Sequence, residues 1–442
     1  MKSWPITSWS SCVDEPVSRC GQNVKMTTAP AQPTGPTEQA ESQGLLLQLL
    51  DPANRADPYP ICAQVRDRGP FPLPPANVAV FSTYRDCDDV LRHPLSSSDR
   101  FKSTMTRRLL ESGAAPRPVG PPGFLFLDPP DHTRLRKLVS KAFAPKVVSA
   151  LQPEISALVG GLLDRIAEKG EFEVVEDFAY PLPVAVICRL LGVPLEDEPR
   201  FSRASALLAQ SLDPFAQFTG QLPDGIEERQ QTAQWLRDYF QGLIEERRSR
   251  PGDDFISGLI AVEESGDQLS EDEIISTCNL LLIAGHETTV NLIGNAILAM
   301  LRNPIHWTAL SADAGRAPAI VEETLRYDPP VQFVGRIAAD DMAIAGLEVP
   351  AGDVMMLLLA AAQRDPAEFD RPDTFDPDRG SLRHLGFGRG AHYCLGAPLA
   401  RLEAGVALSA LTARFPNARL DGEPGYKPNV TLRGLSELAV AV

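Results

Sequence analysis

The feature that most constrains this chain is a glycine-rich run around one cysteine, F-G-R-G-A-H-Y-C-L-G at positions 387–396. Gly388 and Gly390 let the backbone turn where a Cβ would clash, so that successive N–H groups can point at one atom. If that atom is the Cys394 sulfur, the positive end of a helix predicted from the next run, APLARLEAGVALSALTARF, also stabilises the thiolate. A shielded thiolate suits an iron that needs a strongly donating axial ligand. A buried structural cysteine beside a glycine turn is the plainer alternative, although it does not require this spacing.

The bulk composition limits the class of protein. The chain has 442 residues, of which 43% are hydrophobic, enough for one large domain or two ordinary ones. A net charge of −16 argues against nucleic-acid binding. No run approaches about 18 consecutive apolar residues, so we expect no transmembrane helix and no membrane partner. The first 44 residues are predicted to be a disordered tail before a single domain over residues 45–442.

The cysteines indicate the compartment and exclude several metal sites. The seven are scattered, odd in number and without a C-x-x-C pair. This pattern disfavours zinc, an iron–sulfur cluster and a disulfide framework, and it favours a reducing compartment. The N-terminal residues also lack the apolar core of a signal peptide. We therefore expect a cytoplasmic protein.

From Leu45 onward the pattern is mainly helical, with strand-like runs in two places. Strands are predicted at Val78–Ser82, Val331–Ile337, Met342–Val349 and Val354–Leu359, separated by Gly and Pro turns. Helices are predicted at Asp131–Phe143, Ala150–Glu168, Leu182–Leu191, Phe201–Ser211, Ile226–Arg248, Ser270–Leu301 and Pro318–Tyr327. The predicted fold class is mainly α with small β-sheets.

The segment Ser270–Leu301 carries the clearest helix signals. Ser270 and Glu273 form a capping box, and Asn303-Pro304 ends the helix. At about 1.5 Å per residue it spans about 48 Å. Its middle is apolar on most sides, so we expect a buried central helix.

That helix contains A-G-H-E-T-T at positions 284–289, where glycine, acid and hydroxyl conflict with the buried helical setting. Such local conflicts tend to mark function. Ala284 and Gly285 leave room for a flat cofactor and a diatomic ligand. Thr288 can hold a water, and Glu287 can supply protons to it. The alternative is a strained helix kink with Glu287 in a structural salt bridge.

Four basic residues are candidate anchors for a ring that carries carboxylates. His132 and Arg136 stand at i and i+4 on one helix face. Arg336 is a lone charge inside an apolar strand and needs a partner. His392 lies two residues before Cys394. Each also has an alternative interpretation as a solvated basic residue.

Together these motifs resemble those of the cytochrome P450 family, in its haem-ligand signature (387–396) and its oxygen-activating A-G-x-E-T-T (284–289). The resemblance covers roughly Leu45–Val442. It implies a triangular P450 fold with the long helix over the haem, Cys394 as the ligand of the iron of haem b, and Glu287 and Thr288 as catalytic residues. The cofactor contacts that it implies are Ala284, Gly285, His132, Arg136, Arg336, Phe387, His392 and Cys394.

A third motif of the family is E-x-x-R, here Glu323 and Arg326. Alone it is weak, because i, i+3 pairs are common on helices. The resemblance implies a buried ion pair with a later arginine, expected to be Arg379, as a scaffold for the Cys394 loop.

The substrate pocket is expected where the family lines it. The resemblance places Val331, Phe333 and Val334 there, after the E-x-x-R helix, and we add Leu208 and Phe215 from an earlier apolar stretch. These side chains favour a small hydrophobic substrate, although ordinary core packing would look identical.

The implied function is that of a bacterial monooxygenase, which inserts one atom of O₂ into an organic substrate by hydroxylation or epoxidation. Two alternatives are a peroxide-driven or isomerising enzyme on the same fold, and a non-catalytic haem protein that senses gas or binds lipid. The chain has no G-x-G-x-x-G loop for a dinucleotide, so electrons from NAD(P)H are expected through a separate reductase and ferredoxin. A monomer is expected.

An acidic ferredoxin needs a basic docking patch on a protein of charge −16. The candidates around the cysteine loop are Arg134, Lys137, Lys141, Arg389 and Arg401. The alternative is that these are scattered solubilising charges.

Overall fold

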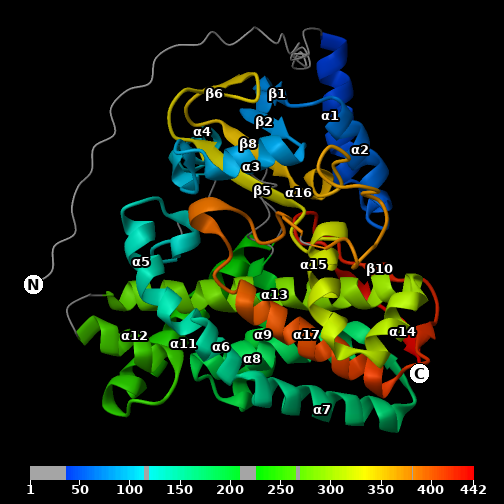
Figure 1. Ribbon diagram of the computed structural model, residues 1–442. Coiled ribbons are helices and arrows are strands. Elements are labelled where there is room, and N and C mark those ends of the chain that lie inside the picture. Colours follow the sequence, from blue (N-terminus) through cyan, green and yellow to red (C-terminus); the bar gives the residue numbers. More distant parts are fainter. Residues whose placement is uncertain (1–35, 114–118, 210–224, 265–268, 381) are drawn as a thin grey trace, which may run out of the picture. The chain divides into compact units, whose positions relative to one another are not determined.

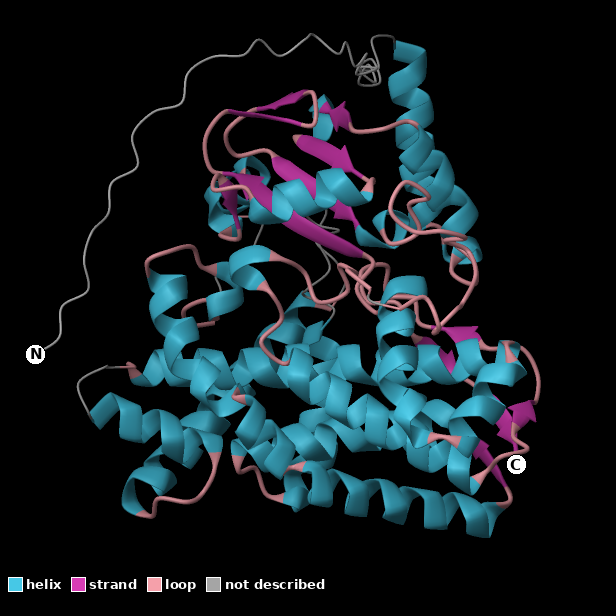
Figure 2. Cartoon of the chain, viewed as in Figure 1, coloured by secondary structure: helices cyan, strands magenta, loops and turns pink. Residues whose placement is uncertain are grey.

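Helices make up most of the protein, and one small five-stranded sheet lies to one side of them (Figures 1 and 2). The structure is a computed structural model that describes residues 36–113, 119–209, 225–264, 269–380 and 382–442. All of these lie in the second of the two units into which the chain divides, Gln32–Val442. The mainly α fold class with small sheets is confirmed.

The α-helices of the described residues are α1 (Pro36–Leu50), α2 (Tyr59–Asp67), α3 (Tyr84–Arg92), α4 (Thr104–Glu111), α5 (Asp131–Val139), α6 (Pro145–Ala150), α7 (Gln152–Lys169), α8 (Pro181–Leu191), α9 (Glu198–Ala209), α11 (Ile226–Ser249), α12 (Phe255–Glu264), α13 (Glu271–Arg302), α14 (Pro304–Ala312), α15 (Ala317–Tyr327), α16 (Leu359–Ala362) and α17 (Ala397–Arg414). The predicted helical segments correspond to α5, α7, α8, α9, α11, α13, α15 and α17, and the structure adds helices that were not predicted.

The strands form four sheets within the described ranges. They are β1 (Phe71–Leu73), β2 (Val78–Phe81), β3 (Ser96–Ser97), β4 (Glu171–Glu173), β5 (Phe333–Ala338), β6 (Met342–Ile344), β7 (Leu347–Val349), β8 (Val354–Leu358), β9 (Arg419–Leu420), β10 (Gly425–Tyr426), β11 (Leu435–Glu437) and β12 (Ala439–Ala441). The largest sheet has the order β1-β2-β8-β5-β3, in which only β2 and β8 pair in parallel. Along β2 and β8, alternate residues enter two separate apolar clusters, so this sheet is buried on both faces.

The long helix α13 is the centre of the helical region (Figure 1). It packs against α8, α9, α11, α15 and α17. The predicted capping box is present: the Ser270 hydroxyl accepts from the Glu273 amide at 3.3 Å, and the Glu273 carboxylate accepts from the Ser270 amide at 2.8 Å. Most of its residues are buried because neighbouring helices pack around it. The buried central helix is confirmed.

Two predictions from the sequence are wrong, one about the N-terminal tail and one about a strand. Residues 36–44, assigned to a disordered tail, begin helix α1. Their polar composition hides the helix, whose burial comes from Leu45, Leu46 and Leu49 in the second half. The single strand predicted at Met342–Val349 is the hairpin β6–β7, because Ala345 and Gly346 both take positive φ and reverse the chain.

None of the helices built from the described residues is long and apolar enough to cross a membrane.

Candidate active site

The Cys394 loop has the backbone geometry that its glycines predict. Gly388 and Gly390 take φ values of +70° and +68°. A Cβ on Gly390 would lie 2.9 Å from the Leu91 carbonyl oxygen, so no other residue fits there without a shift. The Cys394 amide donates to the Phe387 carbonyl at 2.8 Å and closes the loop. Helix α17 begins three residues after the cysteine.

The electrostatics at the Cys394 sulfur combine opposing influences. Burial is the largest and raises the pKa of the thiol, while backbone hydrogen bonds from Gly396 and Ala397 and the charge of Arg136 lower it. Both amides belong to the N-terminus of α17, so the predicted helix-end contribution is present, whereas no amide of the Gly388–Gly390 turn is among these donors. Burial outweighs these influences and keeps the pKa raised, and a coordinated metal ion would act in the opposite direction, because it deprotonates a thiol ligand.

Cys394 and α13 line one cavity of about 330 Å³. Ordinary ligand pockets measure roughly 300–1,000 Å³, so this cavity has the size of a ligand-binding site. Ala284, Gly285 and Thr288 of α13 line it. The Thr288 hydroxyl donates to the Ala284 carbonyl at 2.7 Å, and its lone pairs remain available to accept from a water.

Glu287 does not line this cavity. Its carboxylate forms an ion pair with Lys427 at 2.6 Å, and Lys427 also contacts the Asn291 side-chain oxygen at 3.1 Å. Consecutive helical residues point about 100° apart, so Thr288 faces the cavity while Glu287 faces the segment after β10. The salt bridge named as the alternative for Glu287 is present.

The four candidate anchors gather at one edge of the cavity. Arg136, Arg336 and His392 line it, and the His132 ring packs on the His392 ring at 4.0 Å between centroids. Burial lowers the pKa of Arg336 to about 10. Burial, followed by the Arg336 charge, lowers the pKa of His392 to about 3. Both His132 nitrogens and His392 Nδ1 are buried without a hydrogen-bond partner in the described structure. Among the described residues, Arg336 also has no ion pair. Such a cluster requires an anion.

The predicted substrate residues divide into two groups. Val331, Phe333 and Val334 line the cavity, as expected. Leu208 does not line the cavity: it is buried in α9 within the main core cluster. The prediction failed because an apolar helix face has the same sequence pattern whether it packs on a core or on a ligand. Phe215 lies outside the described residues.

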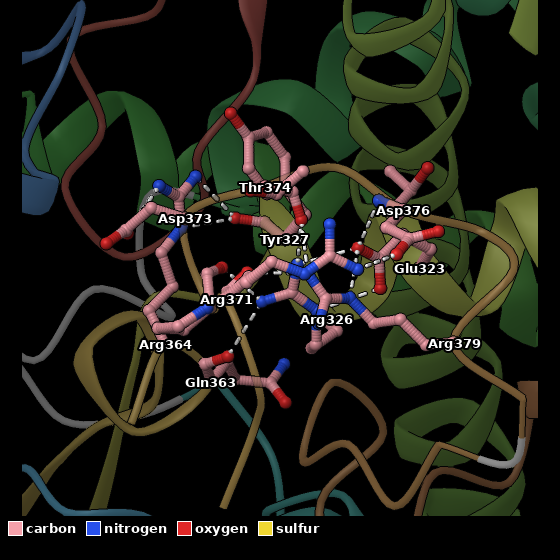
Figure 3. A network of polar contacts seen from close by, with 12 residues as sticks. Glu323, Arg326, Tyr327, Gln363, Arg364, Arg371, Asp373, Thr374, Asp376 and Arg379 are labelled. Carbon is pink, nitrogen blue, oxygen red and sulfur yellow. Dashed lines mark hydrogen bonds and ion pairs between the residues drawn. The ribbon is translucent and has the colours of Figure 1, made fainter. Parts of the chain in front are cut away.

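The E-x-x-R trio forms the predicted network (Figure 3). Arg326 donates to both Glu323 carboxylate oxygens, at 2.8 and 2.6 Å, and Arg379 Nε donates to Glu323 at 3.1 Å. Arg326 also donates to the Gln363, Pro372 and Thr374 carbonyls. These contacts connect α15 to the segment that leads into the cysteine loop.

A family model described as Cytochrome P450 matches residues 75–423. The chain belongs to the cytochrome P450 family. It is 40% identical over 371 residues to cytochrome P450 107B1 of Saccharopolyspora erythraea, covering 82% of this chain and 88% of that protein. It is 38% identical to a vitamin D(3) 25-hydroxylase of Pseudonocardia autotrophica, covering 87% and 94%. The solved structure of Mycobacterium smegmatis CYP164A2 with econazole bound is 66% identical, has a TM-score of 0.87, and is covered completely by 90% of this chain.

The predicted family and reaction class are confirmed: this P450 is a haem-thiolate monooxygenase. Its cavity edge fits the cofactor, because two propionates supply the negative charge that the unpaired Arg336 requires and hydrogen-bond acceptors for the orphaned His132 ring. Bacterial P450s act with redox partners and O₂ on hydrophobic substrates.

The five docking candidates of this P450 differ in availability. Lys137 and Lys141 are exposed. Arg134 forms an ion pair with Glu273, and Arg389 contacts Asp88 at 3.6 Å. Arg401 is held by Glu322 through two bonds, of 2.6 and 2.9 Å.

Sequence reasoning missed three polar residues beside this site: Lys427, Glu322 and His384. Lys427 lies in a Gly- and Pro-rich turn, 140 residues from the carboxylate that it contacts, so no local spacing links the two. Glu322 adjoins the E-x-x-R motif, and its position directly before Glu323 was the one available signal.

Proposed function

We propose that this P450 binds haem b through Cys394 and oxidises a hydrophobic substrate with electrons from a ferredoxin and its reductase. The observation that carries the proposal is the single cavity shared by the Cys394 loop, the α13 segment at Ala284–Thr289 and a buried basic edge. Thiolate-ligated haem, when bound, supplies the oxygen chemistry and favours O–O cleavage. The protein supplies binding, orientation and proton control.

The basic edge would fix the orientation of the cofactor. Arg336 on β5 and Arg136 on α5 approach it from different elements, and His132 and His392 add uncharged N–H donors. The lowered pKa of His392, about 3, which follows chiefly from burial, keeps its imidazole neutral near pH 7. Two guanidinium charges then meet two carboxylates, which leaves the edge electrically balanced.

Thr288 and Glu287 would control the protons. The Thr288 hydroxyl, anchored on the Ala284 carbonyl, can hold a water in the cavity. Glu287 must first exchange its contact with Lys427 for one with that water. The protons therefore enter from the side of Lys427, which also lines a separate surface pocket together with Asn429 and Arg433.

The substrate is proposed to be a hydrophobic molecule. Phe124, Leu125, Phe126 and Ile187 join the predicted Val331 and Phe333 in the cavity wall. The vitamin D(3) 25-hydroxylase relative and the econazole complex of the neighbour from Mycobacterium smegmatis support a bulky apolar ligand. Econazole is therefore the first probe to titrate against the haem absorption band.

Electron supply is proposed to come from separate proteins, with this P450 acting as a monomer. Lys137 and Lys141 are exposed docking candidates. They follow the α5 segment that carries Arg136, which donates to the Tyr393 carbonyl beside the cysteine. A partner held there would lie next to the Cys394 loop.

The axial ligand is tested with Cys394→Ser. The variant is expected to fold and to lose the strongly red-shifted carbon monoxide band of thiolate-ligated ferrous haem. Cys278→Ser, which changes a buried cysteine of α13 that does not line the cavity, is the matched control and should keep the band. A Cys394→Ser protein that retained the band would assign the ligand to another cysteine.

A further inference from the structure

A second ionic cluster lies beside the Cys394 loop, and neither haem binding nor proton control uses it. Glu322 of α15 accepts two parallel hydrogen bonds from Arg401 of α17, Nε to Oε1 at 2.6 Å and Nη2 to Oε2 at 2.9 Å. His384 Nε2 lies 2.9 Å from the same carboxylate. This fork geometry fixes a guanidinium in one orientation more firmly than a single contact does.

The fixed guanidinium is pressed against the cysteine loop. Its Cζ lies 4.5 Å from the centre of the Phe387 ring, and Nη1 is 3.2 Å from the Tyr393 hydroxyl. The Phe387 carbonyl accepts the hydrogen bond from the Cys394 amide that closes the loop, and Tyr393 is the residue directly before the cysteine. Arg401 therefore contacts the two residues that hold Cys394 in place.

The contacts with the Phe387 ring and the Tyr393 hydroxyl place the positive charge of Arg401 next to the cysteine loop. The Glu322 carboxylate, paired with the same guanidinium, places a negative charge there that opposes the effect of Arg401. The two side chains are 36% and 28% exposed, so water screens both charges and each effect should be modest.

We propose that Arg401 and Glu322 are positioning residues that set the electrostatic potential at the Cys394 thiolate and thereby the one-electron reduction equilibrium of the bound haem. The inference rests on the proposed ligation by Cys394. Reduction adds one negative charge to the site, so the Arg401 charge favours it and the Glu322 charge disfavours it. Arg401 thus belongs to the electronic tuning of the site, not to partner docking.

The two charges predict shifts of opposite sign. Arg401→Gln should lower the equilibrium constant for reduction of the holoprotein, and Glu322→Gln should raise it, each by roughly two- to tenfold, where tenfold corresponds to about 59 mV for one electron. The double variant should return close to the wild-type value. Asp378→Asn, which breaks the exposed pair of Arg316 and Asp378, is the control and should cause no shift.

The measurement is a spectroscopic redox titration with a chemical reductant, which needs neither substrate nor partner. Shifts of the same sign in both single variants, or no shift in either, would overturn the proposal, because a merely structural role disturbs the loop in both. If Arg401→Gln does not bind haem, Arg401→Lys keeps the charge and should titrate within about twofold of the wild type. A wild-type holoprotein without the red-shifted carbon monoxide band would instead refute the ligation by Cys394.

Discussion

Replacing Glu323 with glutamine tests the scaffold beneath the cysteine loop. The Glu323 carboxylate forms ion pairs with two guanidinium groups, those of Arg326 and Arg379. The Glu323 and Arg326 side chains are 0% exposed and that of Arg379 is 8% exposed, so water cannot replace the lost charge. Removing one member of a buried ion pair costs about 3–5 kcal/mol. Against a typical total stability of about 5–15 kcal/mol, this loss takes about a fifth or more of the free energy of unfolding.

The assay is urea unfolding of the haem-bound protein, followed by far-ultraviolet circular dichroism at fixed haem and protein concentrations. Asp378→Asn at the exposed pair is the matched control, with an expected cost of about 0–1 kcal/mol. If Glu323→Gln yields no folded protein, Arg379→Gln leaves the Arg326 pair intact and should fall between the two. A Glu323→Gln midpoint equal to that of the control would refute the reasoning from burial.

Three further outcomes are expected. Thr288→Ala should reduce product formation by about 10²- to 10⁴-fold while electron consumption continues, and well-coupled turnover, measured as product per electron, would move the proton route elsewhere. Although burial raises the pKa of Glu322, hydrogen bonds from Arg401 and His384 outweigh it and hold that pKa at about 2, against 4.5 ordinarily. This carboxylate therefore stabilises the fold above about pH 4.5 and loses that contribution as the pH falls toward 2. The urea midpoint of Glu322→Gln should depend less on pH than that of the wild type between pH 5 and 3. An equally steep loss of the midpoint in both proteins would contradict the assignment. Lys137→Glu with Lys141→Glu should slow ferredoxin-driven reduction most at low salt and leave dithionite reduction unchanged, and kinetics unaffected by salt would place docking on another face.

Local patterns in the sequence were enough for the long helices and for the core of the site. The capping box of Ser270 and Glu273 and the stop at Asn303-Pro304 depend on neighbours within one helical turn, so the ends of α13 were predictable. The positive φ values at Gly388 and Gly390 also follow from the local run, because glycine adopts them without strain. The Glu323–Arg326 contact was expected from spacing together with the family resemblance.

Only the tertiary structure decided whether each side chain lines the cavity, packs in the core or pairs with a distant residue. Thr288 and Glu287 are adjacent in the sequence, yet one lines the cavity and the other pairs with Lys427, because the direction of each depends on what packs around α13. Leu208 was indistinguishable from a pocket residue until α9 was seen to pack it into the core. Arg401 appeared to be a free surface charge until Glu322, 79 residues away, was found to hold it. Hydrophobic periodicity and turn residues are local and can be recognised in the sequence. The partner, the burial and the charge balance of a side chain depend on contacts between segments that are distant in the sequence.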